Sequence, residues 1–379
     1  MRVIAGIVGA LVLVGCAMHS EKVWAQAQPA PANDPQQVLI PLPPVKYDTA
    51  AFEARVRGAG GAIDFVFGDA RPFPECHAST VVETADGALL CAWFGGTEES
   101  HNDVGIWLSR FEKGAWSAPI EVAKVNETAH WNPVLFREAD GTIDLFFKVG
   151  REIPFWCTVW IRSKDGGRTW SKPDELVVAD QGGRGPVKNK AILLSDASWL
   201  APASTEYQSW KAFADRSNDG GLTWERSADF AMDPTVVTGR GVIQPTFWES
   251  SPGKVHALLR STAGKIARAD SEDFGRTWTP VRLTTLPNPN SGIDALGLQD
   301  GRVLLVYNPT NKKSGNRSPL NLAVSSDNGE TWTDVVSLET EPGMEFSYPA
   351  IVRTAKGVAV SYTWKRERIR CWQIPLEAL

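Results

Sequence analysis

A small set of side chains, far apart along the chain, is suited to chemistry on an anionic substrate. Tyr348 carries a phenol, and Asp103 and Glu99 carry carboxyl groups that can serve as acids. Arg260 and Arg317 carry guanidinium groups, which bind carboxylates through paired hydrogen bonds. Gathered in one cleft, these groups would hold a carboxylated substrate and keep an acid available.

Polar residues also recur at equivalent places ahead of hairpin turns. A polar side chain lies nine or ten residues before each Asp-Gly-type turn, or at the matching place in the blade that lacks the glycine. An apolar strand would not tolerate such a side chain there without a hydrogen-bond partner. These residues are His77, Asn132, Lys188, Lys190, Gln244, Ser291, Asp294 and Tyr348. A single polar strand start is usually just solvated, but a series in register predicts a lined cavity. Glu206, in a loop expected on the same face, adds a further carboxylate.

An internal repeat explains this regular placement. Four octets start 54 residues apart and read SKDGGRTW, SNDGGLTW, SEDFGRTW and SSDNGETW. A decayed fifth copy, SRFEKGAW, covers residues 109–116. In such an octet the aspartate accepts backbone hydrogen bonds in a tight turn, the glycine supplies a positive φ angle and the tryptophan packs between sheets. We therefore give the octet aspartates a structural role; they are Asp165, Asp219, Asp273 and Asp327.

The repeat also predicts the fold class. Between octets, short apolar runs flank Asp-Gly turns, as antiparallel hairpins do. A 54-residue unit of about four strands fits one blade of a β-propeller. Five octets and one lost copy predict an all-β, six-bladed propeller with four-stranded antiparallel blades over residues 55–379. Residues 61–68, GAIDFVFG, are expected to be the strand that closes the ring against the last blade.

The first 54 residues have the composition of a targeting segment and a tether. Residues 1–25 carry Arg2 and a short apolar run ending in Leu-Val-Gly-Cys16, which matches a bacterial lipobox and predicts lipidation of Cys16. Cleavage after Ala25 or Ala27 is the alternative. Residues 26–54 are rich in Pro, Gln and Ala, as a linker is. The first alternative predicts a periplasmic or outer-membrane lipoprotein whose only membrane contact is the N-terminal lipid, and the second predicts a secreted protein; in both cases the protein functions outside the cytoplasm.

Composition excludes some classes of partner. The net charge is −5 and no basic stripe is present, so the sequence predicts no nucleic-acid partner. No Cys/His spacing indicates a metal, and no cofactor is expected. Cys76, Cys91, Cys157 and Cys371 remain after Cys16. Export permits a disulfide between Cys76 and Cys91 across one hairpin, and four buried thiols are the alternative.

The octets resemble the Asp-box, Ser-x-Asp-x-Gly-x-Thr-Trp, of the sialidase (neuraminidase)-like BNR-repeat family. The resemblance covers nearly all of the chain after the linker. It implies a substrate carboxylate held by three arginines, a tyrosine nucleophile, a glutamate that activates it and an aspartate that acts as acid and base. Arg260, Arg317 and Tyr348 resemble the second arginine, the third arginine and the nucleophile, and Asp103 or Glu99 resembles the proton donor.

Two positions depart from the family pattern. His77 stands where the first arginine is expected, and a histidine binds a carboxylate as a cation only when it is protonated. Gln244 stands where the activating glutamate is expected, and an amide cannot act as a base. These departures are compatible with an acidic sugar other than sialic acid, or with Glu206 supplying the missing carboxylate.

Three functions compete on these grounds. The first is an exo-acting glycoside hydrolase that releases a terminal sialic acid or other acidic sugar from a glycan or oligosaccharide. The second is a glycan-binding propeller without catalysis, and the third is a lyase or another glycosidase of acidic polysaccharides. In each case Asn132, Lys188, Lys190, Gln244 and Glu206 are expected to contact the substrate beside His77 and the two arginines.

Overall fold

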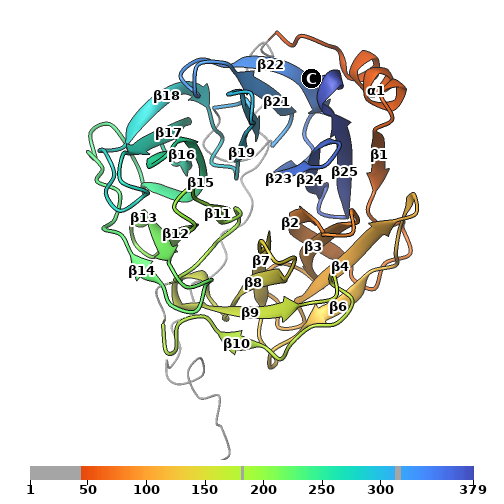
Figure 1. Cartoon of the computed structure of the whole chain (residues 1–379), viewed down its shortest axis with the longest axis horizontal. Coiled ribbons are helices and arrows are strands. Elements are labelled where there is room, and N and C mark those ends of the chain that lie inside the picture. The colour runs from red at the N-terminus through yellow and green to blue at the C-terminus, as the bar shows by residue number, and fades with distance from the viewer. Residues whose placement is uncertain (1–43, 181–182, 312–316) are drawn as a thin grey trace, which may run out of the picture.

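Each copy of the repeat forms one antiparallel sheet, and six such sheets surround a central axis (Figure 1). The computed structural model describes residues 44–180, 183–311 and 317–379. The predicted six-bladed β-propeller is confirmed, with four strands in five blades and a fifth short strand in the remaining one. Cys16 and the proposed signal sequence lie outside the described residues.

The first three blades follow one another along the chain. Blade 1 contains β2 (Glu75–Glu83), β3 (Leu89–Gly96), β4 (Gly105–Glu112), β5 (Ala115–Trp116) and β6 (Ile120–Ala123). Blade 2 contains β7 (His130–Arg137), β8 (Ile143–Val149), β9 (Cys157–Ser163) and β10 (Asp174–Glu175), with the short helix η1 (Ile153–Phe155) between β8 and β9. Blade 3 contains β11 (Ile192–Leu193), β12 (Trp199–Glu206), β13 (Trp210–Ser217) and β14 (Glu225–Arg226).

The last three blades complete the circle. Blade 4 contains β15 (Val242–Ser251), β16 (Lys254–Ser261), β17 (Lys265–Ser271) and β18 (Arg282–Pro287). Blade 5 contains β19 (Asp294–Gly297), β20 (Val303–Tyr307), β21 (Leu320–Ser325) and β22 (Thr333–Glu339). Blade 6 contains β23 (Phe346–Thr354), β24 (Gly357–Trp364), β25 (Arg368–Pro375) and, as its outer strand, β1 (Ala62–Phe65); η2 (Leu376–Ala378) follows.

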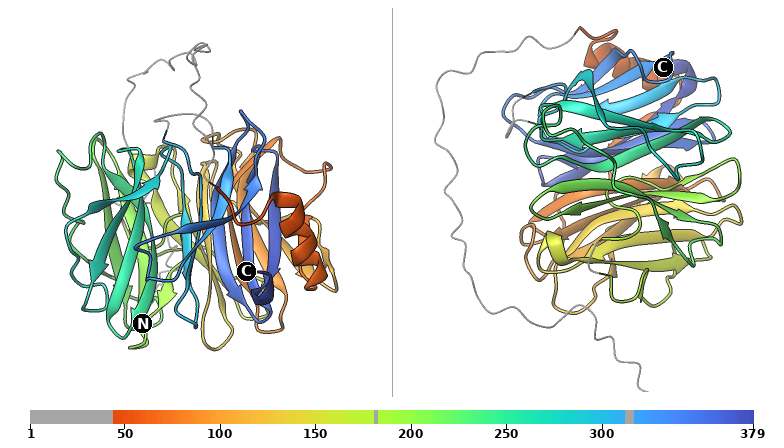
Figure 2. Two further views of the ribbon diagram at one scale, coloured as in Figure 1. Left: turned by 90° about the horizontal axis from the view of Figure 1, so that it is seen from above. Right: turned by 90° about the vertical axis from the view of Figure 1, so that its left-hand side faces the viewer.

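The ring closes through a strand from the beginning of the propeller. As predicted for residues 61–68, β1 pairs antiparallel with β25, and Asp64 lies opposite Cys371. The helix α1 (Thr49–Gly58) precedes β1 and spans the boundary expected between linker and propeller. The Asp48 carboxylate caps α1 by accepting a 2.8 Å hydrogen bond from the Ala51 N–H, and Phe52 and Val56 are buried against blades 5 and 6. Figure 2 shows α1 on the outside of the ring.

The octets form the turns between the third and fourth strands of their blades. In blade 2 the Ser163 hydroxyl donates to Asp165 (2.7 Å) and accepts from the Gly167 N–H (2.8 Å). Asp165 also accepts from the backbone N–H and the hydroxyl of Thr169 (2.9 and 2.5 Å). The same contacts recur around Asp219, Asp273 and Asp327. Each aspartate thus ties its own turn and faces no cavity described below.

The octet glycine also allows neighbouring blades to approach closely. Gly275, in blade 4, has a φ angle of +77°, and a β-carbon added there would lie 2.6 Å from Leu200 Cδ2 of blade 3. The position therefore needs glycine both for its backbone conformation and for the absence of a side chain.

A second repeated feature lies where the inner strands begin. Asn132, Lys188, Gln244 and Tyr348 all have positive φ angles, between 43° and 64°. In blades 2, 4 and 6 this residue falls within a break in strand register, which is the mark of a β-bulge. In blade 1 the residue with positive φ is Ala78, so His77 lies one position before the bulge. Bulges re-aim side chains, and here they turn the strand starts towards the axis.

The cysteines of the described residues are not cross-linked. Cys76, Cys91, Cys157 and Cys371 are buried and none of them forms a disulfide, so the disulfide considered between Cys76 and Cys91 is wrong. The register explains this: Cys76 lies opposite Gly95, whereas Cys91 lies opposite Val81 further along the hairpin. None of the helices in the described part of the chain has the length and apolar character needed to cross a bilayer.

Candidate active site

A cavity of about 380 Å³ opens where the inner strands begin. Its lining comes from all six blades or the loops beside them and combines cations, carboxylates and aromatic rings. The lining residues are His77, Glu99, Ile153, Pro154, Glu206, Tyr207, Trp210, Arg240, Arg260, Arg317, Tyr348 and Arg366. We call it the axial cavity. It brings together Tyr348, Arg260, Arg317, His77, Glu99 and Glu206 from the residues expected from sequence.

The Tyr348 phenol lies among cationic groups. Arg260 Nη1 donates to the Tyr348 hydroxyl at 2.8 Å and to Gln244 Oε1 at 3.2 Å, while Arg260 Nε donates to Asn290 Oδ1 at 2.8 Å. The Arg317 guanidinium lies 5.4 Å from the centre of the Tyr348 ring. These positive charges stabilise negative charge that develops on the phenol oxygen, so the site can support a nucleophilic tyrosine.

Two arginines are joined by a shared carboxylate. Glu345 accepts from Arg317 Nη1 (2.8 Å), Arg366 Nε (3.0 Å) and the Ser347 hydroxyl (2.7 Å). Burial opposes ionisation of Glu345, but the electrostatic interactions with His77, Arg317 and Arg366 and the hydrogen bond from Ser347 outweigh it and lower its pKa to about 2. Glu345 therefore stays ionised and fixes Arg317 and Arg366 at the wall of the axial cavity.

His77 does not add a further cation. Burial, reinforced by the positive charges of Arg366, Arg317 and Arg260, lowers the pKa of its imidazole well below 6.5. The ring packs against Tyr348 with their centres 4.2 Å apart, and neither ring nitrogen has a hydrogen-bond partner among the described residues. The neighbours thus remove the condition under which the histidine was expected to bind a carboxylate as a cation. Arg366, from the turn between β24 and β25, supplies a third guanidinium instead.

The two carboxyl groups in the cavity differ in environment. Glu99 accepts from Arg366 Nη1 at 2.7 Å. No described residue donates a hydrogen bond to the Glu206 side chain, and its pKa is raised because burial outweighs the attraction of Arg260 and Arg240. Glu206 is therefore the carboxyl group better suited to carry a proton.

Asp103 does not line the axial cavity. Its carboxylate is half exposed and binds the Thr97 hydroxyl (2.6 Å) and His101 Nδ1 (2.7 Å) within its own loop. Burial opposes ionisation, but the hydrogen bonds from Thr97 and His101 together outweigh it and lower the pKa of Asp103 to about 2. Of the two proton donors expected in this loop, Glu99 lines the axial cavity together with Tyr348, and Asp103 does not.

Lys188, Lys190 and Asn132 are also absent from the cavity lining. Lys190 Nζ binds Asp294 at 2.9 Å, and Asp294 accepts from the Thr246 hydroxyl (2.7 Å) and the Ile351 N–H (2.9 Å). Lys188 Nζ donates to the carbonyls of Ile293 (2.7 Å) and Pro349, and burial lowers the pKa of Lys188 to about 7.

These contacts join blades 3, 4, 5 and 6 across the axis, beside Tyr348. Asn132 is buried in its own bulge. The recurring polar residues ahead of the hairpin turns do lie near the axis. However, Lys188 and Lys190 hold the blades together there and do not face the axial cavity.

The sequence interpretation missed several lining groups. Arg366, Arg240, Trp210 and Tyr207 line the axial cavity, and Glu345 supports it from behind. Only Arg366 carried a visible signal, because it lies in the charge-rich run of residues 365–370 in a loop expected on this face. Within the described ranges, no three His, Cys, Asp or Glu side chains group as metal ligands.

Comparison with known proteins agrees with this architecture. A family model described as BNR repeat-like domain matches residues 87–360. No curated protein matches the chain in sequence.

Several solved structures are similar in fold. A protein of unknown function from Dyadobacter fermentans is 18% identical, with a TM-score of 0.66, over 83% of this chain and 98% of that one. The Hadza microbial sialidase Hz136 is 19% identical, with a TM-score of 0.69, over 84% and 69%. The NanB sialidase from Streptococcus pneumoniae is 15% identical, with a TM-score of 0.66, over 84% and 71%. At these identities the likeness shows a shared fold.

Proposed function

The chain belongs to the sialidase-like BNR-repeat family, and from this premise we propose that it is a glycoside hydrolase that releases a terminal acidic sugar. One observation carries the proposal. The hydroxyl of Tyr348 lies 2.8 Å from Arg260 in a cavity that also exposes Arg317 and Arg366. A phenol nucleophile and several guanidinium groups together suit a substrate that carries its own carboxylate.

The cations define the part of the substrate that is bound. Arg260, Arg317 and Arg366 present guanidinium donors to one cavity, and such donors pair with carboxylates in a bidentate manner. A neutral phenol avoids the repulsion that a carboxylate nucleophile would meet beside the substrate's own negative charge. The acidic sugar is a sialic acid or a uronic acid in this proposal.

The reaction proceeds by two displacements. The Tyr348 oxygen bonds to the anomeric carbon and loses its proton to water, while the glycosidic C–O bond breaks and Glu206 protonates the leaving oxygen. Water then attacks the anomeric carbon and gives a proton to Glu206, while the tyrosine leaves as phenolate and regains from the solvent the proton that it lost in the first step. Two inversions retain the configuration of the sugar. Glu206 fits the acid role because its pKa is raised, whereas Glu99 is paired with Arg366.

The test compares two tyrosines in the same cavity. Tyr348→Phe should lower turnover of a fluorogenic sialoside or glucuronide by at least about 1,000-fold, with substrate binding retained. Tyr207→Phe, which removes a hydroxyl from the exposed rim, is the matched control and should keep most activity. Equal activity of the two variants would remove Tyr348 from the mechanism.

A second comparison identifies the proton donor. Glu206→Gln should lower turnover of a substrate with a poor leaving group by about 10²–10⁴-fold. It should have much less effect on a nitrophenyl glycoside, whose leaving group needs no protonation. Glu99→Gln is the control. If the loss of turnover depends on the leaving group only for Glu99→Gln, the proton donor is Glu99.

One observation favours a binding protein without catalysis. Arg260 is the only described residue that forms a hydrogen bond with the Tyr348 hydroxyl, and Gln244 beside it cannot take a proton. Calorimetric titration with sialic and glucuronic oligosaccharides distinguishes the two functions. Tight binding without product over a long incubation would support the glycan-binding propeller.

A further inference from the structure

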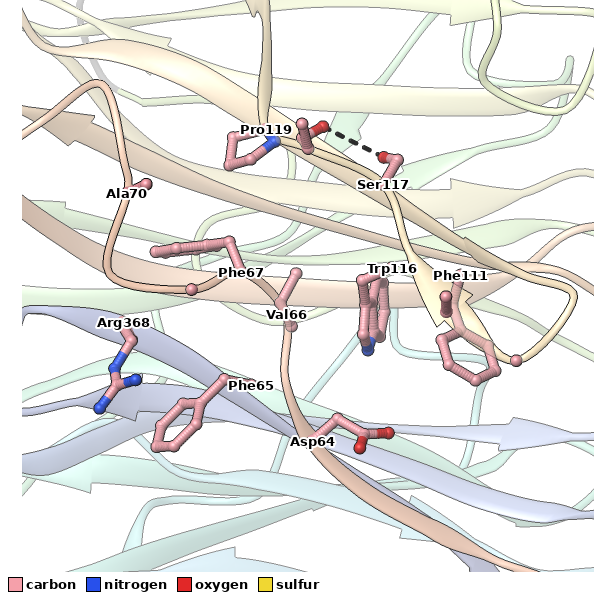
Figure 3. Close-up of a pocket in the computed structure, with 14 residues that line it drawn as sticks. Asp64, Phe65, Val66, Phe67, Ala70, Phe111, Trp116, Ser117, Pro119 and Arg368 are labelled. Carbon is pink, nitrogen blue, oxygen red and sulfur yellow. Dashed lines mark hydrogen bonds between the residues drawn. The ribbon is translucent and has the colours of Figure 1, made fainter.

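A second, larger cavity lies at the seam where the last blade meets the first. Its volume is about 530 Å³, and it lies between β1 with β25 on one side and the hairpin of β4 and β5 on the other (Figure 3). We call it the seam cleft. Phe111 and Trp116 line the hairpin side, and Asp64, Phe65 and Arg368 line the opposite side.

A tryptophan of the decayed octet has an unpaired indole N–H on the hairpin side. In three of the four intact copies the indole N–H of Trp224, Trp278 or Trp332 donates to the carbonyl of the octet glycine at 2.9–3.1 Å, whereas Trp170, in the fourth, has no acceptor among the described residues. Trp116 belongs to the decayed copy, and its indole N–H has no acceptor among the described residues. A buried Trp N–H usually has a partner, so Trp116 carries an unused donor that lies just beneath this wall of the seam cleft.

The opposite side presents a cation and a carboxylate. The Arg368 guanidinium is stacked on Phe65 (3.8 Å to the ring centre) and Trp364 (4.8 Å), and it pairs with Asp69 at 3.1 Å. Arg368 Nε has no acceptor, and no described residue donates to the Asp64 carboxylate. Aromatic faces with N–H donors and a carboxylate acceptor are the groups that bind sugar rings, through stacking and through hydroxyl hydrogen bonds.

The seam cleft is next to the axial cavity along the chain. Arg366 lines the axial cavity and Arg368 lines the seam cleft, and both belong to the segment that joins β24 to β25. Two residues of extended chain span at most about 7 Å, so the backbones of Arg366 and Arg368 are at most that far apart. This separation is shorter than two linked sugar units.

We propose that the seam cleft binds an inner part of the oligosaccharide whose terminal acidic sugar enters the axial cavity. This inference rests on the proposed function and adds the substrate class: an acidic oligosaccharide is preferred to its isolated terminal sugar. Arg368 and the Trp116 N–H donate to hydroxyl or carboxylate oxygens, Asp64 accepts from a hydroxyl, and Phe65 and Phe111 provide apolar faces.

The experiment compares oligosaccharides with monosaccharides by calorimetry. The probes are oligosialic acid of four units with sialic acid, and hyaluronan hexasaccharide with glucuronic acid, titrated into full-length protein carrying Tyr348→Phe so that no probe is consumed. Adding Arg368→Gln should weaken binding of the preferred oligosaccharide about tenfold and leave its monosaccharide unchanged. Arg302→Gln, which removes another partly exposed arginine paired with an aspartate, is the matched control.

Further variants guard against a folding defect. Trp116→Phe keeps a ring and removes the N–H, and Asp64→Asn keeps the side-chain shape; each should weaken oligosaccharide binding severalfold with an unchanged melting temperature. The proposal is overturned if neither oligosaccharide binds, if monosaccharide affinity falls equally, or if the variants change only the oligomeric state in sedimentation. Because calorimetry reads binding alone, absence of turnover in the unmodified protein would refute the hydrolase and leave the seam cleft standing.

Discussion

Positive charge exceeds negative charge around Tyr348. Four arginines and two carboxyl groups line the axial cavity, and burial raises the pKa of one of these carboxyl groups, Glu206. Glu345 lies behind the wall and offsets part of this charge through Arg317 and Arg366. The balance leaves guanidinium donors available for an anion and explains why a buried histidine in the same place stays neutral.

We predict that His77 remains neutral at pH 6.5, where an ordinary histidine is half protonated. Its pKa is depressed by burial and by three arginines, so protonation is favoured only in the unfolded chain and stability falls as the pH drops below 6.5. The imidazole signals in an NMR titration, assigned by comparison with His77→Gln, measure this directly. A midpoint near 6.5 would show that the cations do not act on His77.

We predict that Glu345→Gln weakens both binding and stability. The variant leaves Arg317 and Arg366 without their shared partner, so the Michaelis constant for a carboxylated substrate should rise about tenfold. Because the pKa of Glu345 is lowered from 4.5 to about 2, its contribution to stability is complete above pH 4.5 and disappears as the pH falls through about 2.

The melting temperatures of the unmodified protein and of Glu345→Gln, measured as a function of pH, should therefore differ at neutral pH and become equal in acid. Glu341→Gln, which removes an exposed carboxylate paired with Lys365, is the control and should show little difference. A constant difference at all pH values would mean that the ionised form of Glu345 is not what stabilises the protein.

At the scale of the element, the octet turn has two separable requirements. We predict that Gly275→Ala destabilises the protein by about 2–4 kcal/mol, since alanine is strained at φ +77° and its β-carbon would contact Leu200. Gly301→Ala is the matched control: it has φ +86° but no atom within 4 Å, and should cost only about 1 kcal/mol. Urea unfolding measures both, and equal losses would refute the role of blade contact.

The sequence predicted elements well where the interactions are local. The octets specify their own turns through contacts within eight residues, such as Ser163 with Asp165 and Thr169, and a constant period then predicts the number of sheets. The contact between Arg366 and Glu99 could not be predicted, because it joins residues 267 positions apart and depends on how the ring closes. The same holds for Lys190, whose partner Asp294 lies on another blade.

At the scale of the whole molecule, the N-terminal segment of the described chain fastens the ring. We predict that Phe52→Ala lowers the free energy of unfolding by about 3–5 kcal/mol, because Phe52 is fully buried against blades 5 and 6 through α1. Leu376→Ala, at a 44% exposed position nearby in the fold, should change it by less than about 1 kcal/mol. Unfolding by urea tests the pair, and a loss confined to α1 would show that the ring holds without it.

The bulges at the strand starts have a consequence for how such a protein can change. Asn132, Lys188, Gln244 and Tyr348 occupy the same backbone conformation on different blades, although their side chains share no chemistry. The propeller thus has equivalent positions at which the backbone conformation is the same and the side chain differs. Substitutions can change specificity only where such a position meets the axial cavity, so Tyr348 and Gln244, which both contact Arg260, are the positions to vary, whereas Lys188 and Asn132 are buried away from it.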